Sequence, residues 1–463
     1  MGGTTNKIII LIAFFVFFLI SHLDCTKNKK REKHVLVIDV GTYCDYRLIE
    51  TSVSKLREKY RLVHLTTNKH KMHPDDIHIH YEIPKVLIDK PGEIVTNLTN
   101  DMTKKIQFTT KNPKMVGSTV SSFIYVSYLL NNVIAKYSPI HLVAHYGNLQ
   151  HIIASGCFEK IPTTILHFSP GFIPNRSVPF VFNNGVKLRN YNLYDKKFES
   201  FNVESSVNFI KAVSNLMIDK KSLKKIILPN YDFLKKMNHI MCFDNKLVPN
   251  IDYIIPNLRI INVGLIIPSI HDVPIERYVR KWINRYTNRI IFISFVSYSK
   301  HVLEIFPNLL EMIEYACIQN GLYAFLHDTS GFFTSTRNNN SRLFIYSKYI
   351  SYNAIVPNCK LVCFTGSICL QNVCFQYNCR MLFVPYIPEQ YFWAKIYKMH
   401  TGVDYVDSYV LNNSKNINLS VFSRMVKYAS NTSILLLKKT TTSTRDKNRA
   451  PIKIAHIVEN SVF

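Results

Sequence analysis

The stretch Cys363–Ala394, CFTGSICLQNVCFQYNCRMLFVPYIPEQYFWA, decides the fold of this chain. It begins at the end of an apolar strand, CKLVCF (359–364), and continues with the small residues Gly366 and Ser367, which suit a helix start. A second apolar strand, RMLFVP (380–385), leads into a proline-rich turn that ends with Glu389 and Gln390. Strand, helix and strand in this order predict one unit of a parallel sheet.

The sequence before this stretch repeats the alternation of strands and helices. Further strands are predicted at RIIFISF (289–295), LYAFLHD (322–328) and RLFIYS (342–347). Between the first two, Pro307 opens a segment whose apolar residues follow the helical period, and Gly321 stands where a C-cap glycine belongs.

The first half of the chain has the same pattern. A strand at Val35–Val40 is followed by a segment with Leu48, Val53 and Leu56 on one helical face, and then by the strand RLVHLTT (61–67). A helix over 116–136 and buried strands at Ile140–Ala144 and Thr163–His167 extend the sheet.

The fold predicted is α/β, with two Rossmann-like domains whose parallel sheets face a central cleft. The aperiodic, proline-containing segment LIIPSIHDV (265–273) separates the halves. We expect a first domain over 26–264, a linker over 265–275 and a second domain over 276–445. Ligands of open parallel sheets bind outside the carboxyl ends of the strands, which places the expected site in the cleft.

Length and composition indicate the number of domains and argue against nucleic-acid binding. The chain has 463 residues, a net charge of +26 and only 14 glycines. The length suits two domains with buried cores. The basic residues are scattered and no nucleic-acid-binding motif accompanies them, so we expect no nucleic-acid partner.

The N-terminal segment predicts entry into the secretory pathway. Lys7 is followed by the apolar run Ile8–Ile20, which is shorter than the roughly 20 residues of a membrane span and suits a signal peptide over 1–25. An uncleaved signal anchor is the alternative. We expect the chain in the ER lumen or secreted, with no other membrane span.

The chain would be a glycoprotein if its N-x-S/T sequons are used, at Asn97, Asn175, Asn339, Asn412, Asn418 and Asn431. The ten cysteines include no CxxC pair, which favours buried thiols with one or two disulfides over a zinc site.

Taken together, these segments resemble the UDP-glycosyltransferase family, two-domain GT-B enzymes that move a sugar from a UDP-sugar to a small acceptor. The resemblance covers nearly the whole mature chain. It includes VPNIDYIIPNLRIINVGLI (248–266) before the linker and SFVS (294–297), where Val296 replaces the usual glycine. DKNRAPIKIAHIVE (446–459) resembles the C-terminal helix that crosses back to the first domain, expected over 446–463. Within the family, FTGSICLQ is similar to a motif of the ecdysteroid UDP-glucosyltransferases of insect viruses.

The resemblance implies a donor site in the second half, with no metal and no cofactor beyond the UDP-sugar substrate. Overlaying the signature on Pro385 places the sugar-binding acid–glutamine pair on Glu389 and Gln390. The diphosphate histidine falls on Thr365, beside Gly366 and Ser367, and Ser297 belongs to the same region. The ribose carboxylate falls on Val373, and the uracil-stacking tryptophan on Ser347 beside Tyr346. The resemblance thus implies that the sugar end is kept and the ribose and base contacts are weakened.

The catalytic base is also replaced. Family members use a histidine after the first strand, oriented by an aspartate from a later strand; here Asp45 falls on the base position. The later strand reads HLVAHYG, whose candidates are His141 and His145. A reversed pair of Asp45 and His145 is one interpretation. Asp45 as a helix N-cap and His145 as a half-buried structural residue are the other.

Two functions remain open. One is inverting transfer of a hexose to the hydroxyl of a small lipophilic acceptor of steroid or phenol type, without a metal. The other is a secreted, non-catalytic relative that binds a hydrophobic ligand. The retained Glu389–Gln390 pair favours the first, and the replaced base and ribose contacts favour the second.

Overall fold

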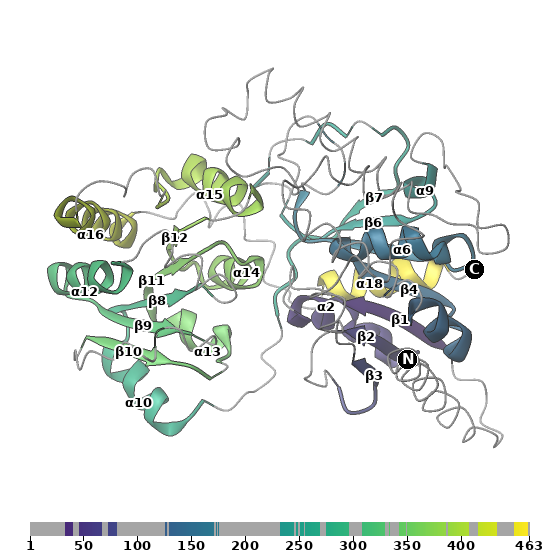
Figure 1. The fold of residues 1–463 in the computed structure, drawn as a ribbon, viewed down its shortest axis with the longest axis horizontal. Coiled ribbons are helices and arrows are strands. Elements are labelled where there is room, and N and C mark those ends of the chain that lie inside the picture. The colour runs from purple at the N-terminus through teal and green to yellow at the C-terminus, as the bar shows by residue number, and fades with distance from the viewer. Residues whose placement is uncertain are drawn as a thin grey trace, which may run out of the picture. The chain divides into compact units, whose positions relative to one another are not determined.

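A computed structural model describes most of the secondary structure of the chain. The residues it describes are 33–39, 46–66, 73–80, 126, 129–170, 173, 175, 232–244, 247–248, 251–253, 255–268, 275–295, 308–328, 333, 342–348, 350–385, 388–406, 415–432 and 449–461. They form two wholly parallel sheets, ordered β3-β2-β1-β4-β5-β6-β7 and β10-β9-β8-β11-β12 (Figure 1). We call the part built on the seven-stranded sheet the first lobe and the part built on the five-stranded sheet the second lobe.

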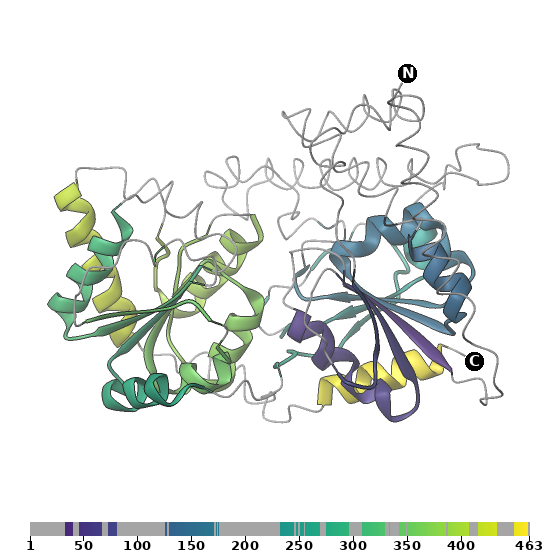
Figure 2. The same ribbon diagram turned by 60° about the horizontal axis from the view of Figure 1, so that its bottom comes forward.

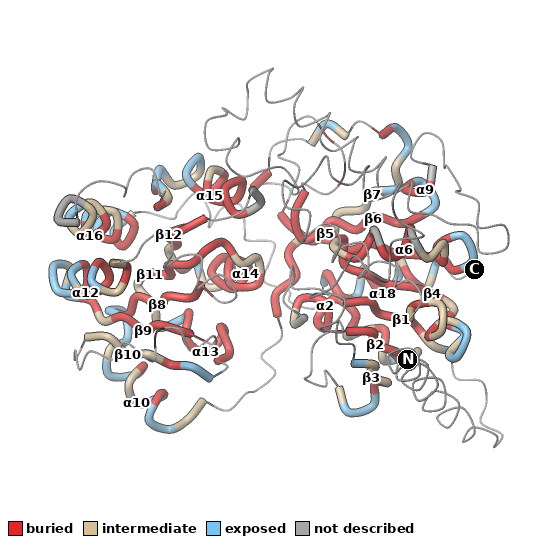
Figure 3. The backbone as a smooth tube through the Cα atoms, viewed as in Figure 1, coloured by how far each residue is buried: buried red, intermediate tan, exposed pale blue. Residues whose placement is uncertain are grey.

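The first lobe contains the strands β1 (His34–Asp39), β2 (Arg61–Thr66), β3 (Ile77–His80), β4 (His141–His145), β5 (Thr163–His167), β6 (Asn238–Met241) and β7 (Ile260–Asn262). Helices cover both faces of this sheet, with α2 (Tyr46–Val53) on one face and α6 (Leu149–Ser155) on the other (Figure 2). Burial on both faces explains why β1, β4 and β5 have almost no exposed residue (Figure 3).

The second lobe contains the strands β8 (Ile290–Ser294), β9 (Tyr323–His327), β10 (Leu343–Tyr346), β11 (Cys359–Phe364) and β12 (Met381–Phe383). Its helices are α10 (Arg277–Tyr286), α12 (Leu309–Asn320), α13 (Tyr352–Ile355), α14 (Ile368–Tyr377), α15 (Pro388–Thr401) and α16 (Lys415–Asn431). β11, α14 and β12 form the strand–helix–strand unit expected from the stretch that begins at Cys363. The predicted α/β class with two parallel sheets is confirmed.

Helix ends follow the expected local chemistry. α12 ends at Gly321, which has the left-handed φ of 65°, and α14 ends at Asn378 with a φ of 51°. Both residues donate backbone N–H groups to carbonyls of the last helical turn. Glycine and asparagine are the residues that adopt this conformation at least cost, so both helices end where the sequence directs.

The segment between the two sheets is bonded to the second lobe by side-chain amides. Asn372 of α14 donates to the carbonyl of Ile266 at 2.9 Å, and Asn353 of α13 donates to that of Pro268 at 3.1 Å. Both asparagines are buried. The amides therefore satisfy carbonyls in a stretch whose backbone belongs to neither sheet.

The last described helix, α18 (Arg449–Asn460), packs against α2 and the adjoining 3-10 turn η1 (Ser54–Glu58) of the first lobe. Ala450, Ile454 and Val458 are buried on one side of this helix. At its end Glu459 lies 2.9 Å from the ammonium of Lys59.

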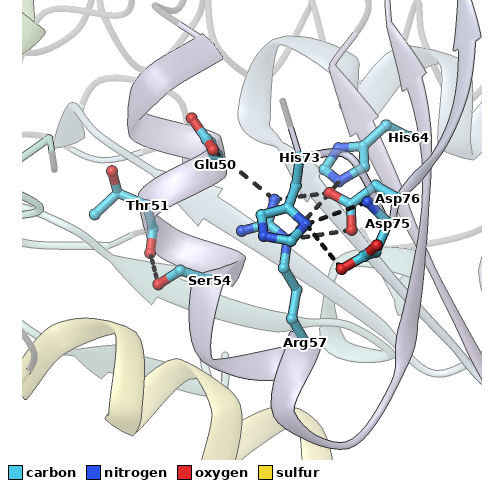
Figure 4. Close-up of polar contacts among 8 residues, drawn as sticks. All are labelled: Glu50, Thr51, Ser54, Arg57, His64, His73, Asp75 and Asp76. Carbon is cyan, nitrogen blue, oxygen red and sulfur yellow. Dashed lines mark hydrogen bonds and ion pairs between the residues drawn. The ribbon is translucent and has the colours of Figure 1, made fainter. Parts of the chain in front are cut away.

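A buried charged cluster joins η1 to the β2–β3 edge of the first sheet (Figure 4). Arg57 donates to both carboxylate oxygens of Asp76, at 2.7 and 3.1 Å, and His64 Nε2 lies 2.9 Å from Asp76 Oδ2. Burial alone would raise the pKa of Asp76, but His64 and Arg57 outweigh it and lower that pKa to about 2. Glu50 lies 4.0 Å from the guanidinium of Arg57.

Eight cysteines fall within the described residues, and all are free thiols, seven of them buried. They match the expectation of buried thiols, and none of the described cysteines forms a disulfide. The sequon residue Asn175 is also buried, and its amide donates to the carbonyl of Ile173, so it is no accessible glycan acceptor in the folded chain. Across the part of the chain that the structure describes, no helix combines the length and apolarity needed to cross a membrane.

Candidate functional site

The carboxyl ends of the second sheet bring together several residues singled out from the sequence. Because all five strands are parallel, their carboxyl ends lie at one edge, where ligands of such sheets bind. β8 ends at Ser294, β9 at His327 and β10 at Tyr346, and Thr365 directly follows β11. The helices α14 and α15 also begin at this edge.

Gly366 and Gln390 are in direct contact at this edge. Gly366 has a φ of 110°, a conformation that favours glycine, and a Cβ built on it would lie 3.1 Å from Cβ of Gln390. Gln390 is 4% exposed. The turn after β11 therefore meets the first turn of α15 so closely that a larger residue than glycine cannot fit without displacement.

The start of α14 follows immediately. Ser367 is its N-cap residue with a φ of −57° and a ψ of 121°, and its side chain makes no capping hydrogen bond. The first N–H groups of a helix have no intrahelical acceptors and carry partial positive charge, so they suit a phosphate. Thr365, two residues earlier, is 1% exposed.

A buried serine–histidine pair lies beside them. His327 Nε2 lies 3.2 Å from the carbonyl oxygen of Lys348, which can only accept, so Nε2 carries the hydrogen. Nδ1 of the neutral ring is then the acceptor, and the Ser294 hydroxyl donates to it at 3.4 Å. Burial lowers the pKa of His327 to about 4. Sequence reasoning missed this histidine, although LHD at the end of a predicted strand was a signal for it.

The family resemblance assigns some residues to contacts with the uracil and the ribose of the donor. In the structure these residues lie in surroundings that do not favour nucleotide binding. Ser347 is exposed and has no aromatic face, while Tyr346 is 6% exposed with its ring 5.9 Å from that of Phe325. Val373 is fully buried within α14. A donor-binding role of Tyr346 stays a prediction.

Three predicted site residues cannot be placed by their side chains. Asp45 and Ser297 lie outside the described residues, and Glu389 is described only as part of the backbone of α15. Its neighbour Gln390 places that part of the helix beside Gly366.

In the first lobe, the candidate His145 is the last residue of β4 and is 2% exposed. The backbone N–H of Gly147 donates to its Nδ1 at 3.2 Å. Its ring centroid lies 3.6 Å from that of Tyr146 and 5.5 Å from that of Phe168. Burial lowers the pKa of His145 to about 3, so the ring is neutral near pH 7.

The other candidate on this strand, His141, has a structural setting. Its Nε2 lies 2.9 Å from the hydroxyl of Thr164, inside the sheet. Two further histidines, His167 and His239, bond to each other at 3.0 Å, and His239 bonds to the carbonyl of Leu234 at 2.8 Å. Of the two candidates, His145 is the one at the carboxyl end of the strand.

No protein-family model matches the sequence. No curated protein matches it either. Solved structures match over almost the whole chain. UGT71G1 of Medicago truncatula, complexed with UDP-glucose, has a TM-score of 0.59 and 11% identity, covering 94% of this chain and 99% of the other. UGT2 of Phytolacca americana, complexed with UDP-2-fluoro-glucose and pterostilbene, has a TM-score of 0.56 and 10% identity, covering 94% and 100%. The calicheamicin glycosyltransferase CalG4 has a TM-score of 0.56 and 12% identity, covering 94% and 99%.

The chain has the GT-B fold. At identities of 9–12% the likeness concerns the backbone, because hardly more than one residue in ten is shared. In this GT-B chain the carboxyl edge of the second sheet carries Thr365, Gly366 and Gln390, and that of the first sheet carries His145.

Proposed function

We propose that this GT-B protein is a glycosyltransferase that moves a hexose from a UDP-sugar to a hydroxyl group of a small lipophilic acceptor. The observation that carries the proposal is the packing of Gly366 against Gln390, which sets the first turn of α15 beside the start of α14. Such an arrangement offers helix N–H groups to a diphosphate and an amide to the sugar that it carries.

Roles for individual residues follow from this placement. Gln390 and its neighbour Glu389 bind sugar hydroxyls, since a carboxylate accepts two hydrogen bonds from a vicinal diol. Gly366, Ser367 and the first turn of α14 receive the diphosphate, with the hydroxyls of Thr365 and Ser297 as further donors. The N–H groups are fixed in place before the reaction, so they stabilise the charge that forms on the leaving group.

The reaction is a single displacement. The acceptor oxygen attacks the anomeric carbon of the hexose, a new C–O bond forms with inversion, and the bond to the β-phosphate oxygen breaks with its electrons remaining on UDP. The proton of the acceptor hydroxyl passes to a base in the first lobe, for which Asp45 and His145 are the candidates. No metal is required for these steps if the helix N–H groups carry the leaving charge.

The proposed acceptor is a steroid or a phenol. The phrase FTGSICLQ and its similarity to ecdysteroid glucosyltransferases favour a steroid, and the pterostilbene bound to the Phytolacca americana structure is a phenolic compound. The apolar N-terminal segment supports a location in the secretory pathway, in the ER lumen or outside the cell.

A second candidate function is a non-catalytic relative that holds a hydrophobic ligand. The exposed Ser347 and the buried Val373 favour it, because neither can supply the stacking surface or the carboxylate that a uridine needs.

Calorimetry with UDP and with UDP-glucose separates the two. Under the proposal UDP-glucose binds more tightly than UDP, and Glu389→Ala removes that preference while leaving UDP affinity within twofold. Glu311→Ala is the matched control, since Glu311 is also an acid in the first turn of a second-lobe helix. Absence of binding by both nucleotides would support the non-catalytic relative.

A further inference from the structure

His145 stands at the position of the first sheet where ligands bind in folds of this kind. From β1 the chain continues to β2 on one side, and from β4 it continues to β5 on the other. The strand order therefore reverses between β1 and β4, and open parallel sheets bind their ligands outside the carboxyl ends at such a reversal. The register pairs Ile38 with Ala144, and His145 is the next residue along β4.

The hydrogen bonding of His145 fixes its tautomer. A backbone N–H can only donate, and the N–H of Gly147 donates to Nδ1. Nδ1 therefore presents a lone pair, and in the neutral ring the hydrogen must be on Nε2. The rings of Tyr146 and Phe168 lie against the imidazole, so its orientation is restricted.

The Nε2–H group points to no acceptor among the residues that the structure describes, although it is buried. A buried donor without an acceptor is costly, and such groups in native proteins are commonly paired with a ligand or a bound water. The missing partner must be an acceptor, and an uncharged oxygen suits a neutral imidazole.

We propose that His145 binds the acceptor substrate, donating its Nε2–H to an oxygen of that molecule, and that it is not the general base. This assignment rests on the proposed transferase function and restricts the acceptor to molecules with an oxygen beside an apolar body. Accepting a proton at Nε2 would require the ring to change tautomer, and Gly147 would lose its acceptor. The proton of the hydroxyl that reacts then goes to a group other than His145.

Long-range ¹⁵N–¹H NMR of the full chain tests the tautomer directly. We expect the Nε2–H form at pH 7, and we expect its ¹⁵N resonance to move on addition of 2-naphthol but not of naphthalene, which has the same body without the oxygen. An imidazolium or an Nδ1–H form would overturn the proposal, and so would failure of 2-naphthol to bind or identical responses to the two compounds.

Two substitutions separate the two ring nitrogens. His145→Asn keeps an oxygen that can accept from Gly147 but has no donor at the position of Nε2, whereas His145→Gln places an amide N–H near that position. Calorimetry should show 2-naphthol binding weakened roughly five- to tenfold in His145→Asn and kept within twofold in His145→Gln. Equal affinities for the two variants and the parent would show that only water occupies the site, and would overturn the proposal.

The same samples separate this inference from the function on which it rests. UDP and UDP-glucose bind to the second lobe under the proposed function, and His145→Asn should leave both affinities unchanged. If neither nucleotide binds while 2-naphthol still shifts the Nε2 resonance, the transferase function fails and the oxygen-binding role of His145 stands. If the nucleotides bind and the resonance does not respond, the role of His145 fails alone.

Discussion

The two lobes share a strand–helix design but bury different chemistry. Among the described residues, the second lobe buries one histidine, His327, whereas the first lobe buries six. The six are His64, His141, His145, His151, His167 and His239. The first lobe also contains the charged cluster around Asp76, while the contact of Gly366 with Gln390 at the carboxyl edge of the second involves no charged side chain. Buried charges are tolerated when they are paired, so substitutions in the cluster around Asp76 should act on stability, whereas those at the second edge should also act on ligand binding.

The largest effect should come from Asp76→Ala. Removing the carboxylate deprives the guanidinium of Arg57 and the ring of His64 of their hydrogen-bonded partner, although Glu50 still lies 4.0 Å from Arg57. Breaking a buried pair in this way costs about 3–5 kcal/mol. Urea denaturation measures the change. Asp75→Ala is the control, because the Asp75 side chain is 89% exposed, and it should change the free energy of unfolding by less than about 0.5 kcal/mol. A loss of under 1 kcal/mol for Asp76→Ala would show that the cluster is not stabilising.

The same carboxylate predicts how stability depends on acid. The pKa of Asp76 is about 2 in the folded chain and 3.8 ordinarily, so the folded state binds this proton less readily than the unfolded one. The resulting stability, about 2 kcal/mol, is complete above pH 4 and is lost as the pH falls toward 2. The difference in free energy of unfolding between the parent and Asp76→Asn should therefore shrink as the pH falls from 4 toward 2. A constant difference between pH 4 and pH 2 would contradict the assignment.

At the edge of the second sheet, Gly366→Ala should cost about 2 kcal/mol, since the new methyl group combines an unfavourable φ with a contact on Gln390. Gly321→Ala is the matched control: its φ is also positive, but a Cβ there would meet nothing within 4 Å, so about 1 kcal/mol is expected. Under the proposed function Gly366→Ala also weakens UDP-glucose binding and Gly321→Ala does not. Equal losses of stability and of affinity in both variants would remove Gly366 from the site.

The smallest effect is expected from placing an aromatic side chain at position 347. Ser347 is exposed at the position that the family resemblance gives to a uracil-stacking tryptophan. Ser347→Trp should strengthen UDP binding by about 1 kcal/mol, roughly fivefold, because an aromatic face lets the base stack. Calorimetry with UDP and with ribose 5-phosphate distinguishes base stacking from a general gain, since the second ligand has no base. A variant that binds UDP no better than the parent would place the base elsewhere.

The sequence was sufficient to predict the architecture because that depends on repeated local patterns. β5 and β11 have the bounds expected from their apolar runs, and α12 ends at Gly321 as its cap residue predicts. The strand expected at 140–144 lies at 141–145, one residue later. An apolar run did not predict that it would end at His145, because this side chain is polar and yet buried in the sheet.

The site was less predictable because it depends on contacts between distant residues. Nothing in the sequence shows that the amide of Asn372 bonds to the carbonyl of Ile266, or that Gly366 touches Gln390. The tautomer of His145 depends on a backbone N–H two residues away, which a sequence pattern does not reveal. His327 was not predicted as a site residue, because its hydrogen bond is made with Ser294, which lies on the neighbouring strand and is distant in sequence.

The packing of α18 on α2 and η1 has a consequence for biosynthesis. The ribosome makes α2 long before α18, so the face of α2 that α18 covers stays uncovered until α18 has been synthesised. The second lobe, whose sheet comes from one continuous stretch of about a hundred residues, can assemble while the first still waits for its final helix. A stop codon shortly before Arg449 would therefore harm the lobe that was synthesised earliest.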